Sequence, residues 1–521
     1  MLGLPQRSER ALSLALRPIF GRSPTYLYFE DSWKITPRLT LNAGLRYEIT
    51  PPWYEPNRRI MNIQMFGWGP DARTPIMTRP GEGDFNDGLQ FRFADVIPTQ
   101  TGDDKMGRAT IQTDRTDFAP RIGLAWSPTS NWSIRLGGGL FYTQDQGNPR
   151  FDIARNLAGR GDFTGSDLIP NSTLDDPWRS ERQSFTCSNW SGNCVGQPFV
   201  LGNVNSRRTP YVGQWLFNIQ RELPGGLAIE TGYMGNVGRK LERLRSTNEP
   251  FLRKGLNDTT SIQARRPFAI YGIIQQVDGV VNSNYHALNL KITKRFTRGL
   301  NVLAGYTWSK SIDDASGIRS SSGEQSIAKW DWNLQDERGL SQFHTGQRLV
   351  LSAIYEIPFF ADAPRAARAV LGGWQGSGII TAATGNPVRV SAIGDTNNIG
   401  GEGNYPDATG ISPTTNAGWA DRFWNIAAFD ISNPELRYRF GNVGRNVLIG
   451  PGYSNVDLSL LKNIATPWEG HRLQFRWEVF NGFNHANWNV PASDARNAAT
   501  FGRVLSARPM RQMQFALKYL F

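Results

Sequence analysis

The chain has 521 residues, including 54 glycines and 17 tryptophans, with 12% aromatic residues and a mean hydropathy of −0.43. No stretch approaches the ~18 to 20 continuous apolar residues that a spanning helix needs, which excludes a helical membrane protein. The net charge is +12, but the basic residues are scattered singly rather than gathered into a tract, and this disfavours nucleic-acid binding.

Residues 1–25 differ from the rest of the chain. Their apolar stretch is short, is interrupted by charges and lacks a small-residue cleavage site, so it is not a convincing secretory signal. Because the remainder has the pattern of an exported protein, we expect Met1 to lie inside a longer gene product, or the N-terminal part to have been lost or mispredicted. A soluble cytoplasmic protein is the alternative.

A hairpin pattern begins at residue 26 and recurs along the chain. Residues 26–49 turn at Thr36-Pro37-Arg38 and then place Leu39, Leu41, Ala43, Leu45 and Tyr47 on one face of a strand. The same alternation predicts hairpins at 121–143, 212–235 and 285–309. Further strands are predicted at 348–357, near 372–390, at 453–463, at 471–482, near 501–508 and at 511–521. The pattern indicates about fourteen strands, give or take two.

These strands have the properties of a membrane barrel. They contain about ten residues, which suffices to cross a bilayer with tilt, and aromatic residues such as Trp33, Trp126 and Trp308 lie near their ends. Short turns alternate with long polar loops near 50–117, 144–211, 236–284, 310–347 and 391–452. We therefore predict an all-β fold, with residues 26–521 forming an antiparallel transmembrane β-barrel in a bacterial outer membrane. A soluble propeller or stacked sandwich is the alternative.

The chain contains two cysteines, Cys187 and Cys194, within the segment CSNWSGNC. Their spacing allows a small loop disulfide in an oxidising compartment, and two unpaired thiols are the alternative.

The predicted last strand ends at an aromatic residue. Its face carries Phe515, Leu517, Tyr519 and Phe521. A C-terminal aromatic that closes an amphipathic strand resembles the signal by which the barrel assembly machinery recognises outer-membrane proteins. An ordinary edge strand is the alternative, although an unprotected edge of this kind favours aggregation.

Six segments of the chain carry a family resemblance: YFEDSWKITPRLTLNAGLRYE (28–48), FAPRIGLAWSP (118–128), NYHALNLKITKRFTRGLNVLAGYTWSKSIDD (284–314), GGWQGSGIITAATGNPV (372–388), FGNVGRNVLIGPGYSNVDLSLLKN (440–463) and LQFRWEVFNGFNHANW (473–488). Together they resemble Oar-like TonB-dependent receptors of acidobacteria. The resemblance implies a 22-stranded barrel with an N-terminal plug and a segment that contacts TonB. Neither N-terminal part is visible here, so the resemblance makes this chain the C-terminal barrel portion.

Charged residues alternate with the apolar ones on the predicted strands. Those predicted to face the lumen are Arg46, Glu48, Arg135, Glu230, Lys291, Arg295, Arg476 and Glu478. They could line a substrate path, because rings of charge set pore selectivity, or they could form lumen salt bridges to a plug. Contact with lipopolysaccharide could also offset the positive charge.

No catalytic motif is visible, and the four histidines lack metal-ligand spacing. We expect no cofactor, no metal and no enzymatic activity. The predicted function is the barrel of a TonB-dependent transporter for a scarce nutrient such as an oligosaccharide, a peptide or a metal chelate. The alternatives are a standalone outer-membrane pore and a surface barrel for adhesion or secretion.

Overall fold

The computed structural model describes residues 7–11, 18–67, 72–89, 92–95, 97–102, 109–143, 152–158, 160–164, 197–318, 328–360, 362–390, 394–400, 404–415 and 422–521. No helix among these residues is long and apolar enough to cross a membrane.

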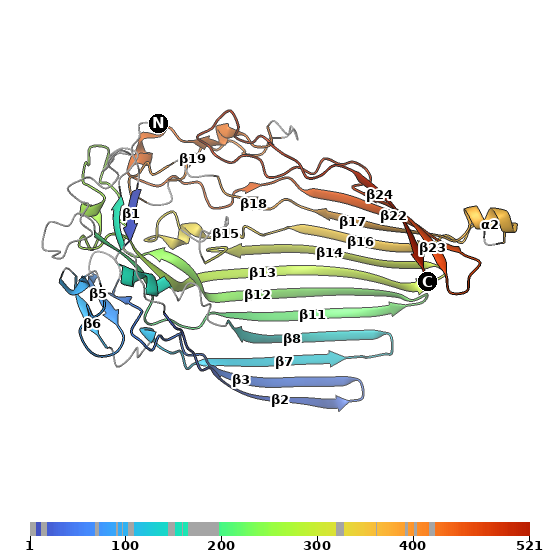
Figure 1. Cartoon of the computed structure of the whole chain (residues 1–521), viewed down its shortest axis with the longest axis horizontal. Helices are drawn as coiled ribbons and strands as arrows, with labels where there is room; N and C mark the ends of the chain where they lie inside the picture. Colours follow the sequence, from blue (N-terminus) through green and yellow to red (C-terminus); the bar gives the residue numbers. More distant parts are fainter. Residues whose placement is uncertain are drawn as a thin grey trace.

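Thirteen long strands form one curved antiparallel wall (Figure 1). In chain order they are β2 (Thr25–Thr36), β3 (Leu39–Ile49), β7 (Asp117–Trp126), β8 (Trp132–Tyr142), β11 (Tyr211–Leu223), β12 (Leu227–Ser246), β13 (Ile274–Thr297), β14 (Leu300–Asp313), β16 (Gln347–Glu356), β17 (Trp374–Ala383), β22 (Tyr453–Ala465), β23 (Arg472–Phe480) and β24 (Gln512–Leu520). Each pairs with the next in this order. The number of strands lies within the predicted range.

The two faces of the wall differ because side chains alternate along each strand. Leu41 on β3 pairs with Leu124 on β7, which pairs with Leu136 on β8, and this row continues to Phe217 and Tyr233. The rows between them carry residues such as Asn42, Arg135 and Glu230. The wall therefore has one apolar and one polar face, as the sequence predicts.

Tight turns join the strands at one end of the wall, on the right in Figure 1. Between β11 and β12, Gly225 and Gly226 both have positive φ angles, 81° and 71°. Residues with a Cβ atom rarely adopt this conformation, so the glycine pair after Pro224 makes the reversal possible. The β16–β17 connection is longer and contains the short helix α2 (Arg365–Leu371).

The long connections lie at the opposite end of the wall and form small structures of their own (Figure 1). The short strands there are β1 (Arg7–Ala11), β4 (Asn62–Phe66), β5 (Arg73–Arg79), β6 (Thr99–Thr101), β9 (Arg160–Thr164), β10 (Gln197–Asn203), β15 (Gly339–Leu340), β18 (Pro387–Val388), β19 (Asp407–Ala408), β20 (Phe429–Asp430) and β21 (Leu448–Ile449). The 3-10 helices are Phe93–Asp95, Asp152–Ala158, Gln263–Arg265, Leu334–Glu337, Ile426–Ala428 and Pro434–Arg437.

Two large apolar clusters lie within these connections, although the sequence predicts polar loops. The first contains Met61, Ile63, Met77, Phe85, Phe93, Ile97, Leu157, Val200, Phe268, Tyr271 and Ile274. The second contains Val390, Trp424, Ala428, Phe429, Leu436, Val443, Leu448, Ala495 and Phe501. The loops are thus packed assemblies, because their apolar residues are buried against residues distant in sequence.

Two further expectations need correction. The loop predicted at 236–284 begins later and ends earlier, since β12 continues to Ser246 and β13 starts at Ile274. The strand predicted near 501–508 does not form. This segment packs through Phe501 into the second apolar cluster, and its one ladder contact is the isolated bridge between Trp488 and Ala507.

Candidate functional site

The polar face of the wall carries the residues that the sequence predicts to line the lumen. The strand registers place Arg46, Glu48, Arg135, Glu230, Lys291, Arg476 and Glu478 on this face. Arg295 lies near the β13–β14 turn and pairs with Glu222 of the same face, with 3.1 Å between Nη2 and Oε1. The structure therefore gathers all eight on one surface, and their role in a substrate path stays a prediction.

Most of these charges pair with one another along the wall. Arg46 Nε lies 3.0 Å from Glu48 Oε1 on the same strand, and Arg476 Nη1 lies 3.6 Å from Glu478 Oε1. Between strands, Lys291 Nζ lies 3.7 Å from Glu230 Oε2. Such partly exposed pairs contribute at most about 1 kcal/mol each. Their main effect is a hydrated surface of alternating charge, suited to polar solutes.

A buried ion pair connects a long connection to the end of β14 that lies next to the loops. The guanidinium of Arg445 contacts the carboxylate of Asp313, and both side chains are 2% exposed. Arg445 Nε also donates to the carbonyl of Glu337 at 2.7 Å. The residues come from three distant segments, so their spacing in the sequence gives no sign that they meet.

Two buried carboxyl groups meet within the long connections. The amide of Asp331 donates to Glu249 Oε2 at 2.7 Å, and the amide of Ser246 donates to Asp331 Oδ2 at 2.5 Å. Burial raises the pKa of Asp331 to about 6, against the opposing effect of the Arg243 guanidinium. Burial, followed by the nearby Asp331 carboxylate, also raises the pKa of Glu249. The loops therefore contain one carboxyl group, Asp331, that titrates in mildly acidic solution, and a second, Glu249, whose pKa is also raised.

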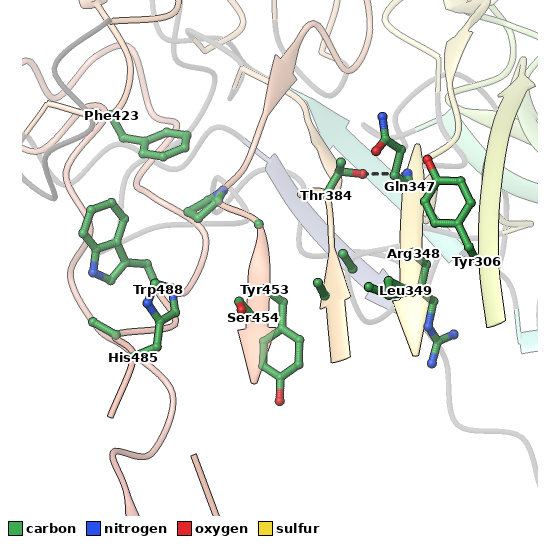
Figure 2. Close-up of a pocket in the computed structure, with 15 residues that line it drawn as sticks. Tyr306, Gln347, Arg348, Leu349, Thr384, Phe423, Tyr453, Ser454, His485 and Trp488 are labelled. Atoms are coloured by element: carbon green, nitrogen blue, oxygen red, sulfur yellow. Dashed lines mark hydrogen bonds between the residues drawn. The ribbon is translucent and has the colours of Figure 1, made fainter. Parts of the chain in front are cut away.

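The apolar face is hollowed near the loops by a pocket of about 620 Å³. Its floor follows one register row across four strands, formed by Tyr306, Leu349, Ala382 and Ser454. Figure 2 shows Phe423 and Trp488 on loop segments beside Tyr453, with Gln347 and Tyr306 on neighbouring strands. In the same view, the backbone amide of Gln347 donates a hydrogen bond to Thr384 Oγ1 at 3.1 Å.

This row belongs to the same face as Leu290, which pairs with Tyr306. A pocket that opens on the apolar face of a membrane barrel faces lipid rather than the lumen. Its aromatic lining agrees with the predicted concentration of aromatic residues near strand ends.

Three of the predicted C-terminal signal residues, Phe515, Leu517 and Tyr519, lie on the apolar face of β24, and Phe521 follows the strand. Phe515 stacks on Trp477 of β23, with 6.1 Å between ring centroids, and Leu517 pairs with Phe475. Tyr519 Oη lies 2.6 Å from His471 Nδ1, and Phe521 stacks on the same histidine ring. Recognition by the assembly machinery stays a prediction.

Two remaining expectations concern other chemistry. Cys187 and Cys194 lie outside the described residues, so their disulfide stays a prediction. Within the described ranges, no group of three His, Cys, Asp or Glu side chains is placed to hold a metal ion.

Comparisons with solved structures return proteins longer than this chain, and several of them are named as transporters. FpvA of P. aeruginosa, in a complex with a pyoverdine and iron, is 12% identical, with a TM-score of 0.40, over 96% of this chain and 38% of FpvA. The Neisseria meningitidis iron transporter FrpB is 12% identical, with a TM-score of 0.42, over 97% and 47%. The Escherichia coli outer-membrane transporter YddB is 10% identical, with a TM-score of 0.43, over 96% and 54%. The chain spans about half or less of the length of these proteins.

No protein of curated function matches the sequence. One family does match: the outer membrane beta barrel domain, over residues 1–514. This match covers nearly the whole chain, and it agrees with an antiparallel wall that has one apolar and one polar face. The chain is an outer-membrane protein and belongs to the outer membrane beta barrel domain family.

Proposed function

We propose that the chain is the barrel portion of a TonB-dependent transporter that takes up a scarce nutrient. The observation that carries the proposal is the polar face of the wall, where Lys291 pairs with Glu230 and Arg46 pairs with Glu48. The long connections at one end of this wall are packed around an apolar cluster of their own. A hydrated surface of this kind suits the passage of a polar solute. The resemblance of several strand segments to Oar-like receptors supports the energy-coupled class.

We further propose that residues 26–521 form part of a 22-stranded wall, with residues 1–25 outside it. Support comes from the two outermost strands, because β2 pairs with β3 and β24 pairs with β23, and nearly all side chains of both are exposed. A strand with an open edge is normally paired or covered in a folded protein. Additional strands between β24 and β2 would form hydrogen bonds with the backbone groups of both open edges.

The partners follow from this proposal. A plug domain and TonB would act through N-terminal sequence, the barrel assembly machinery would read Phe515, Leu517, Tyr519 and Phe521, and the apolar face would contact lipopolysaccharide. The transported nutrient would be an oligosaccharide, a peptide or a metal chelate, since each presents polar groups that the charged side chains of the polar face can bind. FrpB is named an iron transporter and FpvA is described in a complex with a pyoverdine and iron, so ferric chelates are the first compounds to test.

Uptake in intact cells tests the proposal. Cells that carry or lack the gene would receive radiolabelled ferric chelates, oligosaccharides and peptides, with and without an uncoupler of the inner-membrane proton gradient. Gene-dependent accumulation that the uncoupler abolishes is expected for a TonB-dependent transporter. Gene-dependent entry that persists with the uncoupler would identify a standalone pore instead, and surface attachment without entry would identify an adhesion barrel.

A further inference from the structure

A second hollow of the apolar face lies near the loop ends of β12, β13 and β14, and two cationic residues, Lys310 and Arg338, line it. It has a volume of about 750 Å³. We call it the rim groove, and its main lining residues are Tyr233, Leu288, Trp308, Lys310, Arg338 and Leu340.

The strand register shows that the rim groove faces the lipid. Leu288 pairs with Tyr233 on one side and with Trp308 on the other. Two residues further along the same face, His286 pairs with Lys310. The ammonium group of Lys310 therefore belongs to the apolar side of the wall, and not to the polar side that carries Lys291 and Glu230.

The position of Lys310 along β14 places it at the boundary of the membrane. The strand leaves its tight turn at Leu300, and about ten residues cover about 33 Å of extended chain. With a strand tilt of ~40°, this distance corresponds to about 25 Å across the membrane, which is the usual height of the apolar band. The loops begin beyond this point, so Lys310 lies at the level of the lipid headgroups.

The charges around the groove leave a net positive surface. Lys310 is exposed and has no carboxylate partner in the described part of the chain. Arg338 Nη1 lies 3.3 Å from Asp314 Oδ1, while Asp314 Oδ2 accepts the amide of Asn282 at 2.9 Å. Burial and the charge of Lys310 lower the pKa of His344, which also borders the groove. His344 is therefore neutral near pH 7, and Lys310 and Arg338 provide the positive charge.

The apolar part of the groove extends from these cations toward the membrane centre. Trp308 is 60% exposed, and Leu288, which pairs with it, is also exposed. On the neighbouring strand, the hydroxyl group of Tyr233 contacts His286 Nδ1 at 2.8 Å, so its ring is held in place beside Leu288. The result is an apolar channel with cations at its headgroup end.

We propose that the rim groove binds a phosphorylated, acylated glycolipid of the outer leaflet, the chemistry of lipopolysaccharide. Its phosphate groups contact Lys310 and Arg338, and an acyl chain lies along Leu288 and Trp308. The ion pairs between the lipid phosphates and these two side chains offset the free-energy cost of placing a cation at the edge of the apolar band. This proposal deepens the proposed contact between the apolar face and lipopolysaccharide; it rests on the outer-membrane location of the chain and does not require transport.

The test uses the full chain folded in detergent micelles. Native mass spectrometry would measure binding of lipid A and of lipid A lacking its phosphates. Wild-type protein should bind the phosphorylated form at least about tenfold more tightly, as expected for charge-assisted contacts. Lys310→Gln should reduce that preference several-fold. The matched control is Lys518→Gln, which removes the same charge from the polar face of the wall, on β24. This variant should keep the wild-type preference for phosphorylated lipid A.

Three outcomes would overturn the proposal. Equal binding of both lipids by the wild type would make the groove an unspecific lipid contact, and this comparison needs no variant. An unchanged preference in a folded Lys310→Gln protein would place the phosphate site elsewhere. Full competition by millimolar inorganic phosphate would identify a site for the free anion rather than for the lipid.

Discussion

At the scale of single residues, the pair between Arg445 and Asp313 should be the most sensitive contact of the loop assembly. Arg445→Ala leaves a buried carboxylate whose remaining side-chain partner is the hydroxyl of Ser316. Loss of one partner of a buried pair costs about 3 to 5 kcal/mol. We expect faster hydrogen exchange in residues 428–449, measured by mass spectrometry on the folded protein.

The control for this prediction is an exposed pair. Arg496 Nη2 lies 2.9 Å from Asp494 Oδ2, and the two side chains are 55% and 37% exposed. Arg496→Ala should change the free energy of local opening, calculated from the exchange rates, by less than about 1 kcal/mol. Equal effects of the two variants would show that burial of the Arg445 pair does not determine loop stability.

The buried carboxyl groups of Asp331 and Glu249 predict a pH dependence. The pKa of Asp331 in the folded loops, about 6, lies above its ordinary value of ~3.9. Between these values the folded loops bind a proton that the opened loops release, so opening becomes easier as pH rises through this range. Protection factors of amides near Ser246 should therefore decrease from pH 4 to pH 7.

The double variant Asp331→Asn/Glu249→Gln should abolish this slope, because neither amide titrates. Asp430→Asn is the control, since a hydrogen bond from Ser432 lowers the pKa of Asp430 and its titration lies below the range. A slope that persists in the double variant would assign the pH dependence to other groups.

At the scale of elements, the close approach of β17 to the segment that enters β22 depends on a glycine. A methyl group at Gly385 would overlap the carbonyl of Gly450, whereas a methyl group at Gly376 in β17 would meet no atom within 4 Å. Gly385→Ala should destabilise the barrel by about 1 to 3 kcal/mol through overpacking. The temperature at which folded migration in gel electrophoresis is lost should fall for Gly385→Ala and stay unchanged for Gly376→Ala.

At the scale of the whole molecule, the distance between β2 and β24 distinguishes a 22-stranded barrel from a standalone pore. Cysteines at Ser32 and at Gln514 or Ala516 can form a disulfide only if their Cβ atoms approach within about 4.5 Å. In a background without the native cysteines, we expect no cross-link between β2 and β24 in the outer membrane.

A positive control is available on the same strand. Ser32 pairs with Asn42 of β3, so Ser32→Cys/Asn42→Cys should cross-link under the same oxidation. A disulfide between Ser32→Cys and either β24 cysteine would mean that the described strands close on themselves. Such a result would favour the standalone pore.

The sequence by itself determined the wall and its two faces. The alternation from Leu39 to Tyr47 and the turn at Pro224-Gly225-Gly226 are local patterns, and they depend on a side-chain period of two and on the backbone freedom of glycine. For the same reason, the sequence alone places Arg46, Lys291 and the other charged residues on one face.

Only the tertiary structure decided how the loops pack and where the buried charges meet. The hydroxyl of Tyr271 donates to the carbonyl of Pro75, 196 residues away, and Gln276 donates to Ile63, 213 residues away. No local period encodes such contacts, because they form when distant segments bury apolar surface together. The rim groove also depends on tertiary structure. The sequence predicts that Trp308 lies near a strand end, but only the strand register places Lys310 beside His286. The packing of the loops then brings Arg338 to the same groove.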